Sequence, residues 1–233
     1  MPRWKNTLQT NASVQRLKRE AVLKEARRAF GKCGYHNTSL DDIAEALQVS
    51  KGTLYNYIKD KQELLYECHT LALDIGERAV EFGKERGATG AEILRHVLMY
   101  NITSLTEEFG ACAVLTEVDA LRPADRIKTV KRRDSIEKRM VGLINDGIKD
   151  GSIRPLDQKI AVFTIMGVIS WLPRWYSPDG RLSGREIATM ITNLLMPGLL
   201  STNTPATVTA SGQSRAPLVQ RQRKRINIGK RAS

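Results

Sequence analysis

The sequence is poor in the residue types that carry metal or disulfide chemistry. It has three cysteines and three histidines in 233 residues, and neither set contains the close pairs that bind zinc. We therefore expect reduced thiols, no metal site and no cofactor. The G-x-S-x-G, H-E-x-x-H and phosphate-loop motifs are absent and the histidines are isolated, so we expect no catalytic residues and no enzyme activity.

Long apolar segments and strand patterns are also missing. No run of about 18 apolar residues could span a membrane, and the first twenty residues have charges but no apolar core of a secretory signal. We expect a cytoplasmic protein without a membrane partner. Alternation of β-branched residues between turns does not occur, so the sequence predicts an all-α fold.

Positive charge is present in excess, with a net charge of +12 at pH 7, and it is concentrated at the two ends of the chain. Residues 1–61 carry 12 Lys and Arg against 6 Asp and Glu, and residues 201–233 carry 7 against none. Residues 62–200 are balanced, with 18 against 19. The basic ends predict a polyanionic partner, and the balanced middle predicts a different role for the body of the chain.

Apolar residues at helical spacing and capping residues predict helices along most of the chain. Ser39 followed by Asp42 is a capping-box pattern, and Ser50 and Asp60 are further N-caps. The expected helices cover residues 12–32, 40–48, 51–58, 61–82, 91–109, 111–121, 123–150, 157–176 and 183–200. The C-terminal end, residues 201–233, has too little apolar surface to fold, so we expect a disordered basic tail.

Residues 49–61, VSKGTLYNYIKDK, contain few residues that could form a core. Two short helices joined by a tight turn after a longer helix make a helix-turn-helix unit, whose second helix enters the major groove of double-stranded DNA. Leu54 and Ile58 supply its inward contacts. Tyrosines at helical spacing are often partial core, but here they accompany side chains suited to bases and phosphates. The expected DNA contacts are Lys51, Gly52, Thr53, Tyr55, Asn56 and Tyr57, with Lys61 at the start of the next helix.

The same region resembles the signature of TetR-family transcriptional regulators. The similarity covers about fifty residues and is carried by Phe30, Gly34, Tyr35, Thr38, Ser39, Ile43, Ala44, Val49, Ser50, Lys51, Gly52, Thr53, Leu54, Tyr55, Tyr57, Lys61, Leu64 and Leu65. Ser39 joins the expected DNA-binding set with this resemblance. Ile58 and Gln48 depart from the pattern, where the family usually has Phe and often Gly, and Gln48 leaves the geometry of the turn open.

The resemblance implies a homodimer with an N-terminal DNA-binding domain and a larger helical domain that binds a small effector. We expect a flexible N-terminus at 1–12, a helix-turn-helix domain at 13–61 and an effector-binding and dimerisation domain at 62–200. It also implies a repressor that an effector releases from a palindromic operator, through a pivot of the helix that begins at Lys61. The last two helices, 157–176 and 183–200, are strongly apolar and are the expected dimer interface.

The C-terminal stretch SWLPRWYSPDGRLSGREIATMITNLLMPGL resembles regulators of fatty-acid, steroid or aromatic-acid degradation that respond to acyl-CoA thioesters. Trp171 and Trp175 share one helix face, where they serve either as dimer or domain core or as pocket walls. Arg122 and Arg174 are candidates to neutralise a CoA phosphate. A basic cluster offers a further candidate, although a solvated helix face explains it equally well. Its members are Lys128, Lys131, Arg132 and Arg133.

Two alternatives stay open at the level of sequence. The effector is an acyl-CoA or another amphipathic carboxylic acid derivative, or it is an uncharged hydrophobic compound. The protein itself could instead be a constitutive architectural DNA-binding protein without a ligand, which would explain the basic ends but leave the large balanced body without a role. The C-terminal tail adds non-specific DNA affinity, or it serves only solubility.

Overall fold

The computed structural model describes residues 3–109 and 117–201. Among these residues it contains helices and no β-strand, apart from one isolated antiparallel bridge between Ile153 and Leu200. The predicted all-α fold is therefore confirmed. The elements are α1 (Arg3–Cys33), α2 (Leu40–Ala46), α3 (Lys51–Leu54), α4 (Lys61–Arg86), α5 (Gly90–Phe109), the 3₁₀ helix η2 (Val118–Ala120), α6 (Pro123–Lys149), α7 (Gln158–Trp175) and α8 (Gly184–Leu199).

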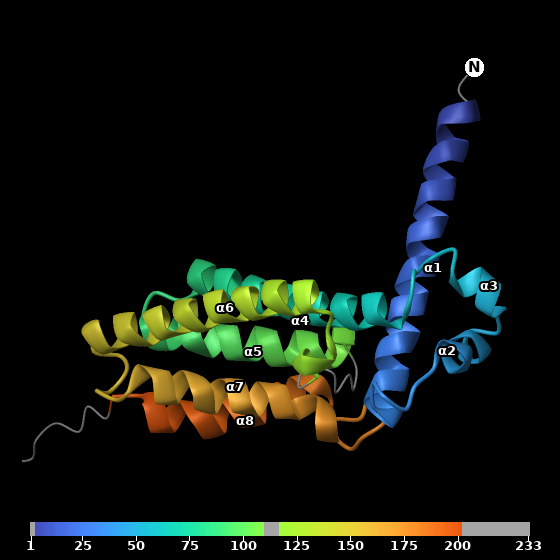
Figure 1. Ribbon diagram of the computed structural model, residues 1–233. Helices are drawn as coiled ribbons and strands as arrows, with labels where there is room; N and C mark the ends of the chain where they lie inside the picture. The colour runs from blue at the N-terminus through green and yellow to red at the C-terminus, as the bar shows by residue number, and fades with distance from the viewer. Residues whose placement is uncertain (1–2, 110–116, 202–233) are drawn as a thin grey trace, which may run out of the picture. The chain divides into compact units, whose positions relative to one another are not determined.

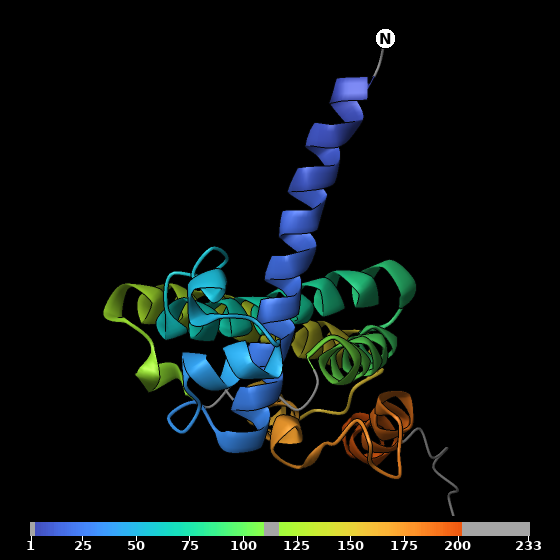
Figure 2. The same ribbon diagram turned by 90° about the vertical axis from the view of Figure 1, so that its right-hand side faces the viewer.

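The N-terminal unit is formed by α1, α2 and α3. Helix α1 ends at Gly34, which has a left-handed φ of +81° and donates its N–H to the Phe30 carbonyl. The predicted capping box of α2 is present: the Ser39 hydroxyl accepts from the Asp42 N–H, and the Asp42 carboxylate accepts from the Ser39 N–H. Figures 1 and 2 show the two short helices lying beside the C-terminal half of α1.

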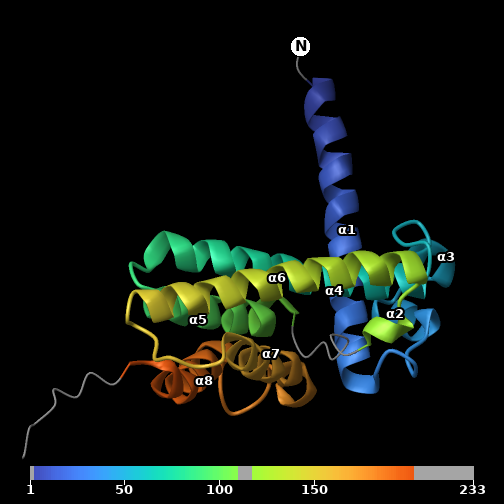
Figure 3. The same ribbon diagram turned by 60° about the vertical axis from the view of Figure 1, so that its left-hand side comes forward.

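The five longer helices from α4 to α8 form the body of the protein, with α5 in contact with each of the other four. Figures 1 and 3 agree that α4 and α6 lie on one side of α5, and that α7 and α8 lie together on the other. Capping residues define several ends, since Asp60, Asp157 and Ser183 each accept a backbone N–H of their helix. Pro123 occupies the first turn of α6, as expected.

Several helix bounds differ from the prediction. Helix α1 begins at Arg3 rather than at residue 12, because residues 3–12 contain no glycine or proline that would break a helix, so this stretch is helical where a flexible N-terminus was expected. The third helix ends at Leu54, and the chain continues through hydrogen-bonded turns to Ile58. Of the helix expected over 111–121, the described part contains the 3₁₀ helix η2 at Val118–Ala120, and residues 110–116 and the tail from 202 lie outside the described residues.

Helix α4 belongs to the two largest of the three hydrophobic clusters among the described residues. Its first turns contribute the fully buried Leu64 and Leu65 to a cluster with Phe30, Ile43 and other residues of the N-terminal unit. Its later turns contribute Ala79 and Val80 to the main core of the body. A shift of α4 therefore has to repack side chains in both units.

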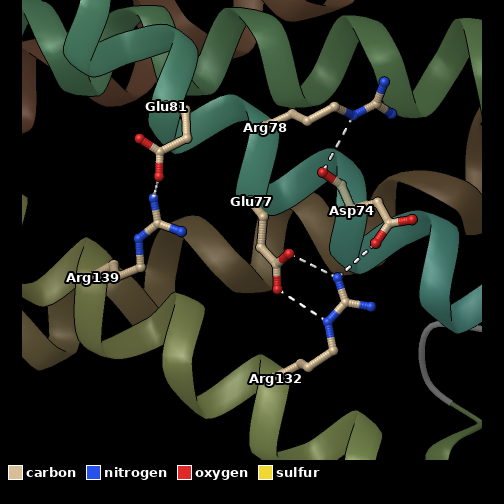
Figure 4. A network of polar contacts seen from close by, with 6 residues as sticks. All are labelled: Asp74, Glu77, Arg78, Glu81, Arg132 and Arg139. Carbon is tan, nitrogen blue, oxygen red and sulfur yellow. Dashed lines mark hydrogen bonds and ion pairs between the residues drawn. The ribbon is translucent and has the colours of Figure 1, made fainter.

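Ion pairs join the outer face of α4 to α6 (Figure 4). The Arg132 guanidinium contacts Glu77 through two hydrogen bonds of 2.8 and 3.0 Å and Asp74 through one of 2.6 Å. Further along α4, Glu81 pairs with Arg139 of α6. Because the two arginine side chains are only partly exposed, the pairs fix the register of α4 against α6.

Candidate DNA-binding surface and effector pocket

The turn between α2 and α3 contains the only non-glycine residue with a positive φ among the described residues, Gln48 at +54°. Its N–H bonds the Glu45 carbonyl, and the Val49 N–H bonds the Ala44 carbonyl. The left-handed conformation costs a residue with a side chain about 1–2 kcal/mol. The turn thus has the tight geometry that a glycine adopts most easily, and Gln48 adopts it under strain.

Helix α3 presents one buried face and one exposed face. Leu54 is fully buried and Ile58 is 3% exposed, as the sequence predicted for the inward contacts. Ser50 caps the helix by accepting the Thr53 N–H, and its hydroxyl also lies 2.8 Å from the Thr53 hydroxyl. The opposite face is therefore available for DNA.

The predicted DNA contacts divide into exposed and half-buried side chains. Gly52, Tyr55 and Asn56 are exposed, with Tyr55 at 49%, and Lys51 is exposed in an ion pair of 2.8 Å with Asp41. Ser39 is exposed at its capping position. Thr53 is partly exposed, and Tyr57 packs against the N-terminal core as a half-buried residue.

Lys61 stands apart from the exposed set. Its Nζ lies 4.3 Å from the centroid of the Tyr35 ring and 3.4 Å from the His36 carbonyl. Partial burial lowers the pKa of its ammonium, and the nearby Asp42 carboxylate acts in the opposite direction. Its place at the first turn of α4 combines this charge with the positive end of the helix, which suits a phosphate.

A cavity of about 100 Å³ lies within the body, between α4, α5, η2, α6 and α7. Most of its wall is apolar. Three polar side chains on three different helices reach it from buried positions, His69 on α4, Asn101 on α5 and Thr129 on α6, and they are 3%, 9% and 3% exposed. One polar atom of each, His69 Nε2, Asn101 Oδ1 and Thr129 Oγ1, has no hydrogen-bond partner among the described residues.

The imidazole of His69 is neutral near pH 7. Its pKa is lowered to about 4, chiefly by burial; an interaction with the Glu117 backbone acts to raise the pKa, and the charge of Arg133 adds to the lowering. Leaving a buried polar atom unpaired costs about 1–3 kcal/mol. Three such atoms around one cavity make it the candidate binding site of the body.

Sequence reasoning missed this site, although a signal for it was present. Asn101 falls between buried leucines in the series Leu94, Leu98, Asn101 and Leu105, which has the 4, 3, 4 spacing of one helix face. Thr129 likewise shares a face with buried Ile136. A polar residue on an apolar stripe is unusual, and two such stripes mark the same cavity.

The residues predicted for the effector lie elsewhere or are paired. Trp171 and Trp175 are 61% and 52% exposed, and they are not among the residues that line the cavity. Arg122 pairs with Asp60, and the Arg174 guanidinium lies 3.5 Å from the Glu117 carboxylate.

The members of the basic cluster differ from one another in their surroundings. Arg132 is held by Asp74 and Glu77 as described above. Lys128 lies 3.5 Å from Asp125 within α6. Lys131 is exposed on the outer side of α6, whereas Arg133 reaches the cavity from an exposed position. Arg133 is thus the member of this cluster that lines the cavity.

The short segment from Glu117 to Arg122 connects the cavity to the N-terminal unit. On the cavity side, Val118 lines the wall and the Glu117 carbonyl bonds His69. On the other side, the Ala120 carbonyl accepts a hydrogen bond of 2.7 Å from Gln62, in the first turn of α4.

Two further contacts add to this connection. The Glu117 carboxylate lies 3.8 Å from His36 Nε2, in the loop between α1 and α2. Arg122 pairs with Asp60, the N-cap of α4, and this hydrogen bond raises the pKa of the Arg122 guanidinium. The segment therefore contacts the pocket and the DNA-binding unit at the same time.

A second exposed feature is an apolar strip on α7 and α8. Ile160, Phe163, Trp171 and Trp175 are 48–63% exposed on α7, and Met190 and Leu194 are 52% and 80% exposed on α8. Both helices lie on the same side of α5 (Figures 1 and 3), so we treat these side chains together as the apolar strip. In contrast, Val162 and Ile165, which were predicted with the same interface, are buried inside the chain.

Known proteins share both parts of this architecture. Residues 22–68 match the family model of bacterial regulatory proteins of the tetR family, and residues 87–199 match the tetracyclin repressor-like C-terminal domain. The HTH-type transcriptional repressor KstR2 of Mycolicibacterium smegmatis is 25% identical over 186 residues, covering 78% of this chain and 90% of that protein.

Solved structures agree with these matches. PfmR, a TetR family transcriptional regulator from Thermus thermophilus, is 30% identical with a TM-score of 0.65, covering 76% of this chain and 97% of its own. AibR in complex with isovaleryl coenzyme A and operator DNA is 28% identical with a TM-score of 0.65, covering 77% and 98%.

A capped helix-turn-helix joined through one long helix to a helical body defines the class of helix-turn-helix transcriptional regulators. Within that class, the chain belongs to the TetR family. Among residues 3–109 and 117–201, no helix is long and apolar enough to cross a membrane. No group of three potential metal ligands occurs in the same part of the chain.

Proposed function

We propose that the protein is a homodimeric repressor that binds a palindromic operator and is released from it by a small amphipathic effector, such as an acyl-CoA. The observation that carries the effector-dependent part is the cavity with three buried and unpartnered polar atoms, adjoining the segment that contacts the N-terminal unit. The AibR complex, which contains isovaleryl coenzyme A and operator DNA, supports an acyl-CoA as the effector class.

DNA binding is assigned to the exposed face of α3 and the residues next to it. Asn56 and Thr53 read base edges, whereas Tyr55, Tyr57, Lys51, Lys61 and Ser39 contact or orient toward phosphates, and Gly52 permits a close approach of the backbone. The exposure of Tyr55 and Asn56 supports this division. The half-buried Tyr57 can reach DNA only through its hydroxyl end, because its ring packs against the core.

Dimerisation is assigned to the apolar strip on α7 and α8. A surface with two exposed tryptophans and an 80% exposed leucine is costly in water, and burial against an identical strip removes this cost. This assignment gives Trp171 and Trp175 the interface role among the two alternatives that the sequence left open.

Release of DNA follows from the shared contacts of the cavity. An effector that enters the cavity contacts Val118 and His69, and both connect to the segment 117–122. Movement of this segment shifts the Asp60 cap of α4 and the loop that contains His36. Each half of the dimer then changes the position of its recognition helix, and the two helices no longer match the operator spacing.

Fluorescence anisotropy with a selected operator tests the proposal. Duplexes are selected from random sequences, and an inverted repeat is expected among those retained. Asn56→Ala should weaken binding to the selected duplex and leave binding to a scrambled duplex unchanged, whereas Lys61→Ala should weaken both and reduce the salt dependence by about one charge. Equal losses on both duplexes for Asn56→Ala would rule out base readout by this residue.

The effector step is tested by adding acyl-CoAs of graded chain length to the preformed complex. Displacement of DNA by at least one of them, together with a rise in melting temperature of the free protein, is expected. The alternative of a constitutive architectural protein predicts a rise in melting temperature with DNA and no response to any small molecule. That result at about 100 μM effector, far above the dissociation constants expected for such regulators, would refute control by acyl-CoA.

A further inference from the structure

The cavity has hydrogen-bonding properties that restrict what its ligand can be. The Glu117 carbonyl accepts a hydrogen bond from the His69 ring, and Nε2 of the same ring has no partner among the described residues. We assign the proton of the neutral ring to Nδ1, because Nε2 is the nitrogen without a partner among the described residues, and Nε2 then presents a lone pair to the cavity. A ligand group facing this nitrogen must donate a hydrogen bond.

The other two polar side chains add both donor and acceptor capacity. The Thr129 hydroxyl can donate and accept, and its oxygen has no partner among the described residues. The Asn101 amide presents its oxygen in this structure, and a half-turn of the amide would present its nitrogen instead. The cavity thus requires one donor on the ligand and can serve an acceptor on the same group.

A hydroxyl group meets this requirement, whereas a methyl, carboxylate or carbonyl end does not. A methyl end leaves all three buried atoms unpaired. A carboxylate or a carbonyl has only acceptors, which would face the lone pair of Nε2. Protonation of His69 could rescue a carboxylate, but burial and the charge of Arg133 hold the ring neutral and oppose that.

The size of the cavity and the position of Arg133 orient the ligand. A volume of about 100 Å³ is that of a few water molecules, at about 30 Å³ each in the liquid. Only the end of an amphipathic effector is enclosed. The exposed Arg133 also lines the site, so an anionic remainder of the effector can lie beside its guanidinium toward solvent.

We propose that the effector carries a hydroxyl group at the end enclosed by His69, Asn101 and Thr129, and an anionic part at Arg133. The effector class is then a hydroxylated acyl thioester or a related hydroxylated acid derivative rather than a simple acyl-CoA. This inference rests on the proposed function, because it requires that the cavity is the effector site.

A matched series of six-carbon thioesters tests the inference with the full-length protein. Hexanoyl-CoA, 6-hydroxyhexanoyl-CoA and adipoyl-CoA share the chain length and the CoA group, and they differ only in a methyl, hydroxyl or carboxylate end. Each is titrated against the protein–operator complex by anisotropy and against the free protein by thermal shift, and eight-carbon homologues test a longer reach. The hydroxyl compound should act at a concentration about 10-fold or more below that of the other two.

Variants connect this preference to the cavity. His69→Phe keeps a ring but removes the acceptor, so the ratio between the hydroxyl and methyl compounds should fall toward one. Thr129→Val is nearly isosteric and should reduce the same ratio even if His69→Phe fails to fold. Thr192→Val is the matched control, because Thr192 is also buried with an unpartnered hydroxyl and is not among the residues that line the cavity.

The outcomes separate this inference from the function on which it rests. If the methyl or carboxylate compound acts at the same concentration as the hydroxyl compound, the hydroxyl preference is refuted and the acyl-CoA response stands. If Thr192→Val changes the ratio as much as Thr129→Val, the cavity is not the site of discrimination and the inference is refuted. If no compound of either length displaces DNA or shifts the melting temperature, both the inference and the acyl-CoA response are refuted.

Discussion

Buried His69 makes the stability of the protein depend on pH in a way that can be calculated. Its pKa is lowered from 6.5 to about 4 in the native state, chiefly by burial, so the unfolded chain binds a proton in a range where the native chain does not. The contribution of His69 to the free energy of unfolding is fully present above about pH 6.5, and it is lost as the pH falls toward 4.

The size of this loss follows from the two pKa values. One pKa unit corresponds to about 1.4 kcal/mol. Between pH 7.5 and pH 5 the single group therefore removes about 2 kcal/mol from the free energy of unfolding, and by pH 4 it removes about 3 kcal/mol. For a domain that is stable by about 5–15 kcal/mol, either change is large enough to measure.

Urea denaturation followed by far-UV circular dichroism checks this prediction at a series of pH values. The total protein concentration is held constant, because the stability of a dimer depends on it. Carboxylates also titrate in this range. The informative quantity is therefore the difference in the free energy of unfolding between the wild type and His69→Gln at each pH. That difference should change by about 2 kcal/mol between pH 7.5 and pH 5, with the wild type losing more.

His36→Gln provides the control for the loss of one histidine, since the His36 side chain is 73% exposed and lies outside the cavity. If His69→Gln loses stability with decreasing pH as steeply as the wild type, His69 does not titrate as its burial requires. That result would refute the lowered pKa of the His69 ring.

Three further predictions concern the turn, the dimer and the connecting segment. Gln48→Gly should stabilise the protein by about 1 kcal/mol in urea denaturation by removing left-handed strain, whereas Gln48→Ala should not; equal effects would contradict the strained geometry. Leu194→Glu should produce a monomer of about half the dimer mass by light scattering, and Ile127→Glu, at a similarly exposed apolar site on α6, should remain a dimer. Arg122→Ala removes the ion pair with Asp60, so operator affinity should persist while the effector displaces DNA less effectively in anisotropy; unchanged displacement would exclude the pair from the coupling.

Local chemistry was predictable from sequence because it depends on residues close together in the chain. The capping box of Ser39 and Asp42 and the caps at Ser50 and Asp60 define the starts of their helices, and the structure contains each of them. The end of α3 was less predictable. The chain tightens after Leu54 into turns that place Ile58 in the core, and no local signal distinguishes these turns from a continued helix.

Contacts between distant segments could not be predicted in the same way. His69, Asn101 and Thr129 are on separate helices, and only their packing brings them to one cavity. Their irregular place on apolar stripes indicated burial without indicating a common site. The exposed strip of α7 and α8 is a similar case, because the periodicity predicted apolar helices but could not divide their residues between the core and the surface.

The cavity and the DNA-binding unit are linked by the same polar groups that make the cavity costly. The His69 ring interacts with the Glu117 backbone, which leaves Nε2 for a ligand, and the Glu117 carboxylate lies 3.8 Å from His36 of the N-terminal unit. A ligand that hydrogen-bonds Nε2 removes part of the free-energy cost of the unpaired buried atoms. Because the recovered energy is available only in the arrangement that fits the ligand, it can drive a change in the segment 117–122. Reciprocity then requires operator DNA to weaken effector binding by the same factor by which the effector weakens DNA binding. Apolar replacement of Thr129 should therefore stabilise the free protein and reduce this coupling together, whereas the same replacement of Thr192 should stabilise it and leave the coupling unchanged.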